Sequence, residues 1–352
     1  MKLVPDASIA VADIGDLLAE MRPKLHRYCA RMTGSVIDGE DVLQDVLIKA
    51  VESFASAGPV RNAEGWLFRV AHNTALDFLR RRSRQEALRS GEEVDMIADP
   101  ADTVLSRQIA SASLRTFMRL PVAQRSCVIL MDVLGCSLSE VCEVMDFSLP
   151  AVKAALHRGR TRLRELADEP DDLPHPELSE ADRDRLGAYV AHFNARDFDA
   201  IRAMISDDVR LDLVNKTRMT GKAEVSRYFG NYSKAGDWHL VPGLVEGRPA
   251  ILVFDPNQPG SGPKYFMLLQ WSADKVATIR DFRHAPYIIE GAEYDLIRRD
   301  KENGDDDVRR PAPLNCLPRS MAQRTKKTSR AGEGADQTIR PRQRATAPAA
   351  DG

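Results

Sequence analysis

Arginine and asparagine side chains recur at helical spacing along residues 66–82, WLFRVAHNTALDFLRRR, and such side chains suit a polyanionic partner. Arg69, Asn73 and Arg80 line one side of the predicted helix, and Arg81 follows Arg80 in a run of three arginines. Guanidinium groups held in a row can bind the phosphates of a nucleic acid. The stretch alone also allows a core helix with a solvated basic end, so its neighbours must decide between the two interpretations.

Carboxylates open the preceding predicted helix, residues 38–54, where a helix N-terminus favours negative charge. Apolar residues recur at helical spacing through the rest of that stretch. A Gly-Pro break at residues 58–59 and a short loop that includes Asn62 then lead into the basic helix. The sequence therefore predicts an acidic amphipathic helix, a loop and a basic amphipathic helix in succession.

A helix-turn-helix pattern lies within residues 114–166. Ser137 or Ser139 can cap its first helix, and a turn at Asp146 to Ser148 ends that helix. The hydroxyl at the end of the turn is the expected N-cap of a second helix, which has a proline early in its first turn, where the missing N–H costs little.

The second helix of this pair exposes a basic face. A recognition helix enters the major groove of DNA with its N-terminal residues nearest the bases, so Lys153 is the candidate for a base-edge or early phosphate contact. Arg158, Arg160 and Arg162 are expected to hold phosphates, which position a helix without specifying a sequence. A basic solvated helix with no nucleic-acid role is the alternative.

The acidic helix, loop and basic helix together resemble region two of the sigma-70 family, and residues 114–166 resemble region four. The short connection between them is similar to that of the compact extracytoplasmic-function (ECF) group. The resemblance implies an initiation factor whose partners are core RNA polymerase and promoter DNA. It implies polymerase binding by Asp38, Glu40, Asp41, Gln44 and Asp45.

The same resemblance implies two sets of promoter contacts. Contacts with the minus-10 element are expected from Asn62, Arg69, Asn73, Arg80 and Arg81. Contacts with the minus-35 element are expected from Ser148, Lys153, His157, Arg158 and Arg160. Loop residues 60–63 are expected to hold a flipped base, whereas Trp66 is expected to anchor its helix rather than to stack on a base.

Composition limits the remaining classes of function. The chain has 352 residues and a formal net charge of −2, so any contact with nucleic acid must come from local basic patches. Its five cysteines show no CxxC pair and no histidine at zinc-finger spacing, so neither a metal nor another cofactor is expected. No apolar run approaches the roughly 20 residues of a membrane span, and the N-terminus lacks the order of a signal peptide. A cytoplasmic protein without a membrane partner is expected.

The periodicity changes after a proline- and acid-rich break at residues 167–180. Helical stretches precede several alternating segments, which predict antiparallel strands and an α+β fold with helices on one sheet face. Two of these segments are expected to form a hairpin with its turn at Ser272 to Lys275. This layout resembles the SnoaL-like cone fold, shared with ketosteroid isomerase and nuclear transport factor two. The resemblance implies an apolar pocket that could hold a catalytic carboxylate or a small ligand. Candidates for this pocket are Tyr189, His192, Asp212, Trp238, Trp271 and Asp281.

Simpler roles compete for the same residues. Asp281 stands between Arg280 and Arg283, which suggests a surface ion pair, and aromatic residues at strand spacing usually belong to a core. We therefore expect the C-terminal domain to modulate activity by contacting the sigma regions or polymerase, where its tethering raises the effective concentration. Enzyme activity is not expected, and the sequence leaves open whether the domain binds a small ligand.

The predicted organisation is multidomain. It comprises an all-α region two at 10–82, a linker at 83–112, an all-α helix-turn-helix region four at 113–167, a linker at 168–178, an α+β SnoaL-like domain at 179–300 and a disordered basic tail at 301–352. The predicted function is promoter-specific transcription initiation as a sigma factor, modulated by the C-terminal domain. Two alternatives are a helix-turn-helix regulator, which would leave residues 38–82 unexplained, and a SnoaL-like enzyme with accessory helices.

Overall fold

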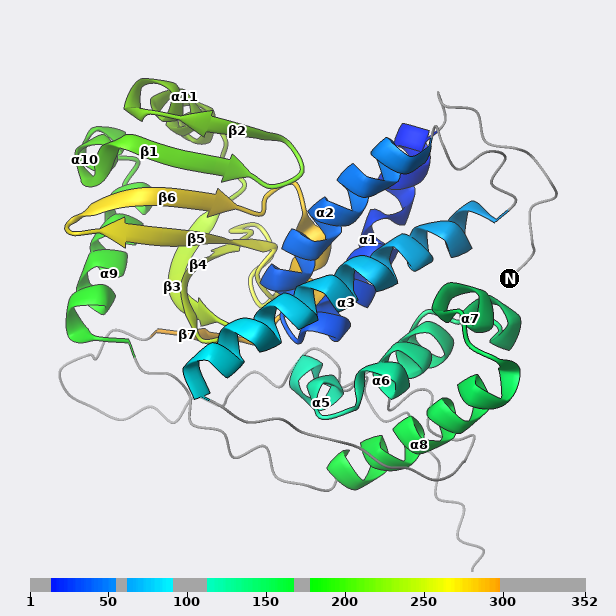
Figure 1. The fold of residues 1–352 in the computed structure, drawn as a ribbon. Coiled ribbons are helices and arrows are strands. Elements are labelled where there is room, and N and C mark those ends of the chain that lie inside the picture. The colour runs from blue at the N-terminus through cyan, green and yellow to red at the C-terminus, as the bar shows by residue number, and fades with distance from the viewer. Residues whose placement is uncertain (1–13, 55–61, 91–112, 168–177, 298–352) are drawn as a thin grey trace, which may run out of the picture. The chain divides into compact units, whose positions relative to one another are not determined.

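The computed structural model of the chain describes residues 14–54, 62–90, 113–167 and 178–297 (Figure 1). The predicted tail, most of the two predicted linkers and loop residues 60 and 61 lie outside the described residues. Within the described residues, no helix combines the length and apolarity that crossing a membrane requires.

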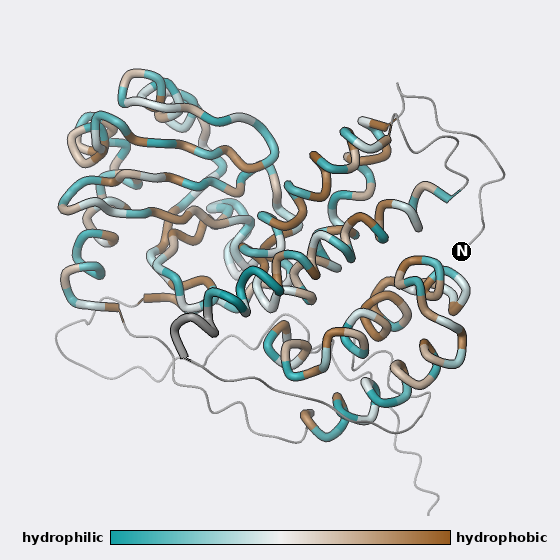
Figure 2. The backbone as a smooth tube through the Cα atoms, viewed as in Figure 1, coloured by the Kyte–Doolittle hydropathy of each residue, from teal (hydrophilic) through white to brown (hydrophobic). Residues whose placement is uncertain are grey.

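Three helices form the first part of the fold: α1 (Ile14–Thr33), α2 (Val36–Phe54) and α3 (Ala63–Ser90). Polar and apolar residues alternate along them (Figure 2), and Leu25, Leu43 and Phe68 meet in their common core with at most 1% of their surface exposed. A Cβ at Gly39 would lie 2.6 Å from the Ala30 backbone, so glycine lets α1 and α2 approach closely. The α3 helix continues past Arg82 into the stretch predicted as a linker, because SRQEALRS holds good helix formers and no proline.

The helix-turn-helix part follows. Its elements are α5 (Leu114–Met118), α6 (Val122–Val128), the π-helical η2 (Ile129–Val133), α7 (Leu138–Met145) and α8 (Leu149–Ala167). Ser137 forms a capping box with Glu140 at the start of α7, and Asp146 ends α7 in the left-handed conformation at φ 56°. Ser148 Oγ accepts the Ala151 N–H at 3.4 Å, so the predicted cap of the second helix is confirmed.

The helix-turn-helix part packs on the first three helices through one shared apolar cluster. Arg125 of α6 is buried, and its guanidinium donates to the Met32 carbonyl of α1 at 2.6 Å. The Tyr28 hydroxyl on α1 lies 2.8 Å from Nδ1 of His72 on α3. The thiols of Cys29 and Cys127 are buried, whereas those of Cys136 and Cys142 are half-buried.

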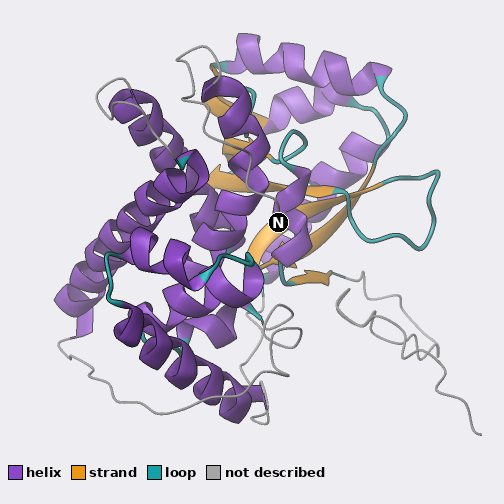
Figure 3. Cartoon of the chain, turned by 90° about the vertical axis from the view of Figure 1, so that its right-hand side faces the viewer, coloured by secondary structure: helices purple, strands orange, loops and turns teal. Residues whose placement is uncertain are grey.

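The third part of the chain is an α+β domain of helices and one sheet (Figure 3). Its helices are α9 (Glu180–Asn194), α10 (Phe198–Met204), α11 (Lys222–Lys234) and the 3-10 helix η3 (Pro286–Gly291). Its strands are β1 (Ile205–Leu213), β2 (Thr217–Thr220), β3 (His239–Val245), β4 (Arg248–Phe254), β5 (Tyr265–Ser272), β6 (Lys275–Asp281) and β7 (Tyr294–Leu296). They pair in the order β2-β1-β6-β5-β4-β3-β7 in one sheet.

The hairpin predicted at Ser272 to Lys275 is confirmed by the pairing of these two residues across β5 and β6. The expectation of antiparallel strands is wrong for one pair, because β1 and β6 run parallel. These two strands are joined by α11 and the β3–β5 meander rather than by a tight turn, which allows the parallel pairing. The core of the sheet is continuous with Ala30, Val36 and Ile37 of the first three helices.

Candidate functional site

The acidic residues at the start of α2 lie in different environments. Asp38 is half-buried, Glu40 is fully buried, and Asp41 and Asp45 are exposed. Glu40 at 0% exposure cannot touch a partner in this conformation. The five residues predicted to bind polymerase therefore do not form one free surface.

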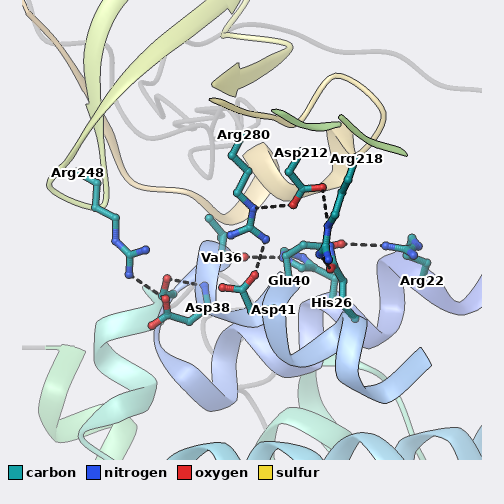
Figure 4. Close-up of polar contacts among 12 residues, drawn as sticks. Arg22, His26, Val36, Asp38, Glu40, Asp41, Asp212, Arg218, Arg248 and Arg280 are labelled. Atoms are coloured by element: carbon teal, nitrogen blue, oxygen red, sulfur yellow. Dashed lines mark hydrogen bonds and ion pairs between the residues drawn. The ribbon is translucent and has the colours of Figure 1, made fainter. Parts of the chain in front are cut away.

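Arginines of the sheet domain contact three of these five residues (Figure 4). Arg248 of β4 donates to Asp38 at 2.8 Å, and Arg280 of β6 pairs with Asp41. Arg218 of β2 donates to the Gln44 side chain at 3.0 Å. Of the other two residues, Glu40 is buried, and Asp45 faces α3, where Arg81 lies 3.7 Å away.

Glu40 lies at the centre of a buried polar group between α1, α2 and η3. Its carboxylate accepts hydrogen bonds from Arg22 at 2.8 Å and from the Tyr287 hydroxyl at 3.0 Å. The Tyr287 ring also packs edge-on against His26, with 5.1 Å between the ring centroids. Burial raises the pKa of Glu40, and burial lowers the pKa of His26 to about 4.

The β3–β4 turn supplies a cap for α2. Glu246 Oε2 accepts the Ser35 hydroxyl at 2.5 Å, and Oε1 accepts the Val36 N–H at 2.6 Å. A carboxylate at this position satisfies an otherwise unpaired helix N–H and complements the helix dipole. Burial raises the pKa of Glu246.

The predicted minus-10 residues follow α3 from its start to its exposed basic end. Asn62 caps the helix, because its side-chain oxygen accepts the Gly65 N–H at 2.9 Å. Arg69 donates to the Glu143 carbonyl of α7, so the helix-turn-helix part occupies its guanidinium. Arg80 and Arg81 are 65% and 60% exposed.

A groove of about 540 Å³ runs between α2 and α3 beside these arginines. Arg80 and Arg81 line it together with Asp45, Lys49 and Asp77. Trp66 is half-buried and packs edge-on against Phe54, with 5.8 Å between the ring centroids, as an anchoring residue would. Asn73 is exposed on α3, so it is accessible along with the two arginines.

The five predicted minus-35 residues have two kinds of environment on α8. Lys153 is exposed, and Ser148 caps the helix. Arg160 makes a two-pronged contact with Asp132 of η2, at 2.9 and 2.6 Å. His157 and Arg158 are half-buried. Lys153 is therefore the most accessible cation of this set, whereas Arg160 is held within its own domain.

The six predicted pocket residues are not brought together. Tyr189, Trp238 and Asp281 are buried in the core, whereas His192 is 43% exposed and Trp271 is half-buried. Asp212 faces away from that core, because its neighbours Leu211 and Leu213 on β1 point inward. It lies instead 3.4 Å from Arg218 and 3.7 Å from Arg280, beside α2.

The surface ion pair considered for Asp281 is wrong, because its side chain is 0% exposed. Its carboxylate accepts the Tyr228 and Tyr232 hydroxyls, both at 2.8 Å, and the Arg283 N–H at 2.8 Å. Burial raises the pKa of Asp281. The helix-facing side of the sheet is filled by rings around Phe193, including Trp238 at 5.2 Å between ring centroids.

The sequence analysis did not identify the residues that join the two halves: Arg22, His26, Arg218, Glu246, Arg248, Arg280 and Tyr287. The partners of a surface arginine depend on which segment packs beside it, so no local pattern marks these residues. The Glu246-Gly247 turn between two alternating segments was the only available signal, and it indicates a hairpin rather than a cap.

Family models match both helical parts of the chain. Sigma-70 region 2 matches residues 17–85, and sigma-70, region 4 matches residues 114–163. The ECF RNA polymerase sigma factor SigG of Mycobacterium tuberculosis is 29% identical over 305 residues, covering 76% of this chain and 81% of that protein. The ECF sigma factor SigW of Bacillus subtilis is 30% identical over 166 residues, covering 44% of this chain and 87% of that protein.

A crystal structure of the Mycobacterium tuberculosis extracytoplasmic function sigma factor SigJ is also similar. It shares 20% sequence identity, covers 76% of this chain and 95% of that chain, and aligns with a TM-score of 0.29.

A three-helix domain followed by a helix-turn-helix, each matching its own family model, defines a protein of the sigma-70 family. Within it, the chain belongs to the ECF RNA polymerase sigma factors, as its identity over most of SigW shows. Its function is sigma-dependent initiation of transcription, and an α+β domain follows the two sigma regions.

Proposed function

We propose that α2 docks this sigma factor on core RNA polymerase, that α3 and the loop before it engage the minus-10 element, and that α8 engages the minus-35 element. We propose further that the C-terminal SnoaL-like domain modulates this activity. The observation that carries the modulating role is the contact of this domain with Asp38, Asp41 and Gln44. A domain that binds the docking helix can change how often that helix is available.

The minus-10 role rests on exposed cations near the docking helix. Arg80 and Arg81 project from α3, and Asn73 is exposed about two turns earlier. Cations in such a row follow the phosphates of a displaced strand, and the amide can donate to base edges. The contact of Arg69 with Glu143 must break before Arg69 can join them.

The minus-35 role rests on Lys153, which is exposed in the second turn of α8. Recognition helices place this part of the helix in the major groove. Arg160 has a different role in this proposal, since its pair with Asp132 braces α8 against η2. It positions the recognition helix rather than touching a base.

The proposed role of the SnoaL-like domain is not catalytic. A general base must reach its substrate, and the Asp281 carboxylate is fully buried and accepts three hydrogen bonds from its own domain. These contacts support a structural role for Asp281, which ties α11 to the last long strand of the sheet.

Run-off transcription with bacterial core polymerase, on a template that carries the gene's own upstream region, tests the proposal. Wild type should give a specific transcript. Asp45→Ala should reduce both core binding and transcript, because Asp45 belongs to the docking set but lies outside the contacts with the sheet domain. Arg227→Ala, on an exposed helix face of the SnoaL-like domain, should leave both unchanged.

Removal of the SnoaL-like domain gives the sign of its control. A chain ending near Glu169 is compared with the full chain. Ala30 and Ile37 become exposed when the domain is removed, so circular dichroism is used to set equal concentrations of folded protein. Equal transcript from the two chains would contradict the modulating role. No transcript and no core binding from any form would contradict the assigned roles of α2, α3 and α8.

A further inference from the structure

The acidic face of α2 is only half covered. Asp41, Asp45 and Ile48 follow one another at three- and four-residue spacing, so they share one side of the helix. The sheet domain contacts this side at Asp41, whereas Ile48 and Val51 further along are each 56% exposed. Two exposed apolar side chains that continue a carboxylate stripe are typical of a surface that awaits a protein partner.

The face of the sheet domain that meets α2 is built for this contact. Its three arginines come from three different strands, β2, β4 and β6, and converge on one helix (Figure 4). Asp212 lies between two of them, 3.4 Å from Arg218 and 3.7 Å from Arg280. Arg280 also packs over the Phe282 ring, with 5.2 Å from its guanidinium carbon to the ring centroid, and is only 17% exposed. Preorganised cations of this kind recognise a row of carboxylates.

We propose that the SnoaL-like domain and RNA polymerase compete for the same side of α2, with the arginine face of Arg218, Arg248 and Arg280 occupying Asp38, Asp41 and Gln44 in the free protein. The inference rests on the proposed docking role of α2. It identifies the partner surface by chemistry: the polymerase must place cationic or hydrogen-bond-donating groups where these arginines lie.

The contact has a strong part and a weak part. The strong part consists of the hydrogen bond from the first turn of α2 to Glu246, the hydrogen bond from Tyr287 to the buried Glu40, and the shared apolar cluster. The ion pairs of Arg248 and Arg280 form the weak part, since each has an exposed or half-exposed member. The arginine face does not cover Asp45, Ile48 and Val51. Polymerase can therefore make its first contact with these three residues while the arginines are still bound to the first turns of α2.

Competition makes a quantitative prediction. When only the open fraction of molecules can bind, the apparent dissociation constant equals the intrinsic one divided by that fraction. Weakening the arginine face must therefore tighten core binding without any change in α2 itself. Couplings of this kind typically change affinity by about 5- to 150-fold.

The first experiment compares two full-length double variants with the same change of charge. Arg248→Glu with Arg280→Glu reverses the arginine face, whereas Arg202→Glu with Arg227→Glu changes α10 and α11, where these arginines pair with Asp199 and Glu224. The first variant should bind core polymerase at least about fivefold more tightly than wild type. The second should bind as wild type does. Hydrogen exchange at the Val36 N–H shows whether the contact has opened in the first variant. If this exchange is faster than in wild type and the variant still binds core polymerase no more tightly than wild type does, the proposal is overturned.

The second experiment needs no variant and decides the matter if the charge reversal leaves the contact closed or unfolds the domain. Wild-type protein is treated with phenylglyoxal, with and without saturating core polymerase, and modified arginines are mapped by mass spectrometry. If the two partners compete, Arg248 and Arg280 should be modified more in the complex than in the free protein. Modification of Arg227 should not increase. Unchanged modification in a complex that does form refutes competition but leaves the docking role of α2 intact. Failure of every form to bind core polymerase would instead reject the docking role, and the competition with it.

Discussion

Glu246 lies at the turn between β3 and β4, yet its Oε1 accepts the backbone N–H of Val36, the first residue of α2, at 2.6 Å. The two residues are 210 positions apart in the sequence. The α+β domain thus supplies the N-terminal cap of the helix that carries the predicted polymerase contacts.

Replacing Glu246 should weaken this cap. Glu246→Gln keeps the shape but removes the charge from the helix N-terminus, and we expect a loss of about 1–2 kcal/mol in the free energy of unfolding. Urea unfolding measures the loss, and hydrogen exchange locates it at the first turn of α2. Glu290→Gln is the matched control, because Glu290 is 69% exposed and lies 3.9 Å from Arg27. Equal losses for the two variants would show that Glu246 contributes nothing as a cap.

Replacing both exposed arginines at the end of α3 should separate DNA engagement from polymerase docking. Arg80→Ala with Arg81→Ala should change the free energy of unfolding by no more than about 0.5 kcal/mol, because both ion pairs are exposed. The yield of open complex should fall, and the slope of its logarithm against log salt should decrease by about 2. Permanganate footprinting measures the yield, with core binding as the control. An unchanged footprint would reject the minus-10 role of these arginines.

Two cations of α8 should respond in opposite ways. Arg160→Ala removes both hydrogen bonds to Asp132, whose side chain is 2% exposed, and should lower the free energy of unfolding by about 2–4 kcal/mol. Lys153→Ala should leave stability within about 0.5 kcal/mol of wild type, since Lys153 is exposed, but should weaken transcription from promoters that depend on the minus-35 element. Thermal unfolding and run-off assays measure the two effects. Destabilisation by Lys153→Ala, or none by Arg160→Ala, would reverse the assignment.

Acid should loosen the contact between the sheet domain and α1. Burial lowers the pKa of His26 from 6.5 to about 4 in the folded protein, so the unfolded chain binds this proton first as the pH falls. The stability from neutral His26 is complete above pH 6.5 and is lost between pH 6.5 and about 4, by up to about 3 kcal/mol.

Urea unfolding of wild type and His26→Gln across this pH range isolates the effect. The raised pKa values of Glu40 and Glu246 act in the opposite direction, because these groups bind protons first in the folded state, but they act in both proteins. The difference between the two proteins should therefore shrink as the pH falls to about 4. A constant difference would show that His26 does not titrate as its burial requires.

Local chemistry explains which structural features were predictable. The Ser148 cap and the hairpin at Ser272 to Lys275 depend on residues within a few positions of one another, and both were predicted correctly. Leu211 and Leu213 of β1 point inward, so strict strand alternation excludes Asp212 from the pocket for which it was predicted. The Asp281 site was harder, because its flanking arginines suggested solvent while the tyrosines that bury it come from α11.

Local sequence patterns were sufficient to predict the two sigma regions, the helix-turn-helix with the Ser148 cap of its second helix, the change to an α+β domain and thereby the family. Periodicity, capping residues and turn residues act over a few positions, so they can be read directly from the chain. Long-range packing, by contrast, buries Glu40 under Tyr287, brings Arg248 and Arg280 to the carboxylates of α2, and pairs Arg160 with Asp132 of its own domain. A charged side chain takes the partner that packing brings within about 4 Å, and across 210 or 247 positions no local pattern specifies that partner.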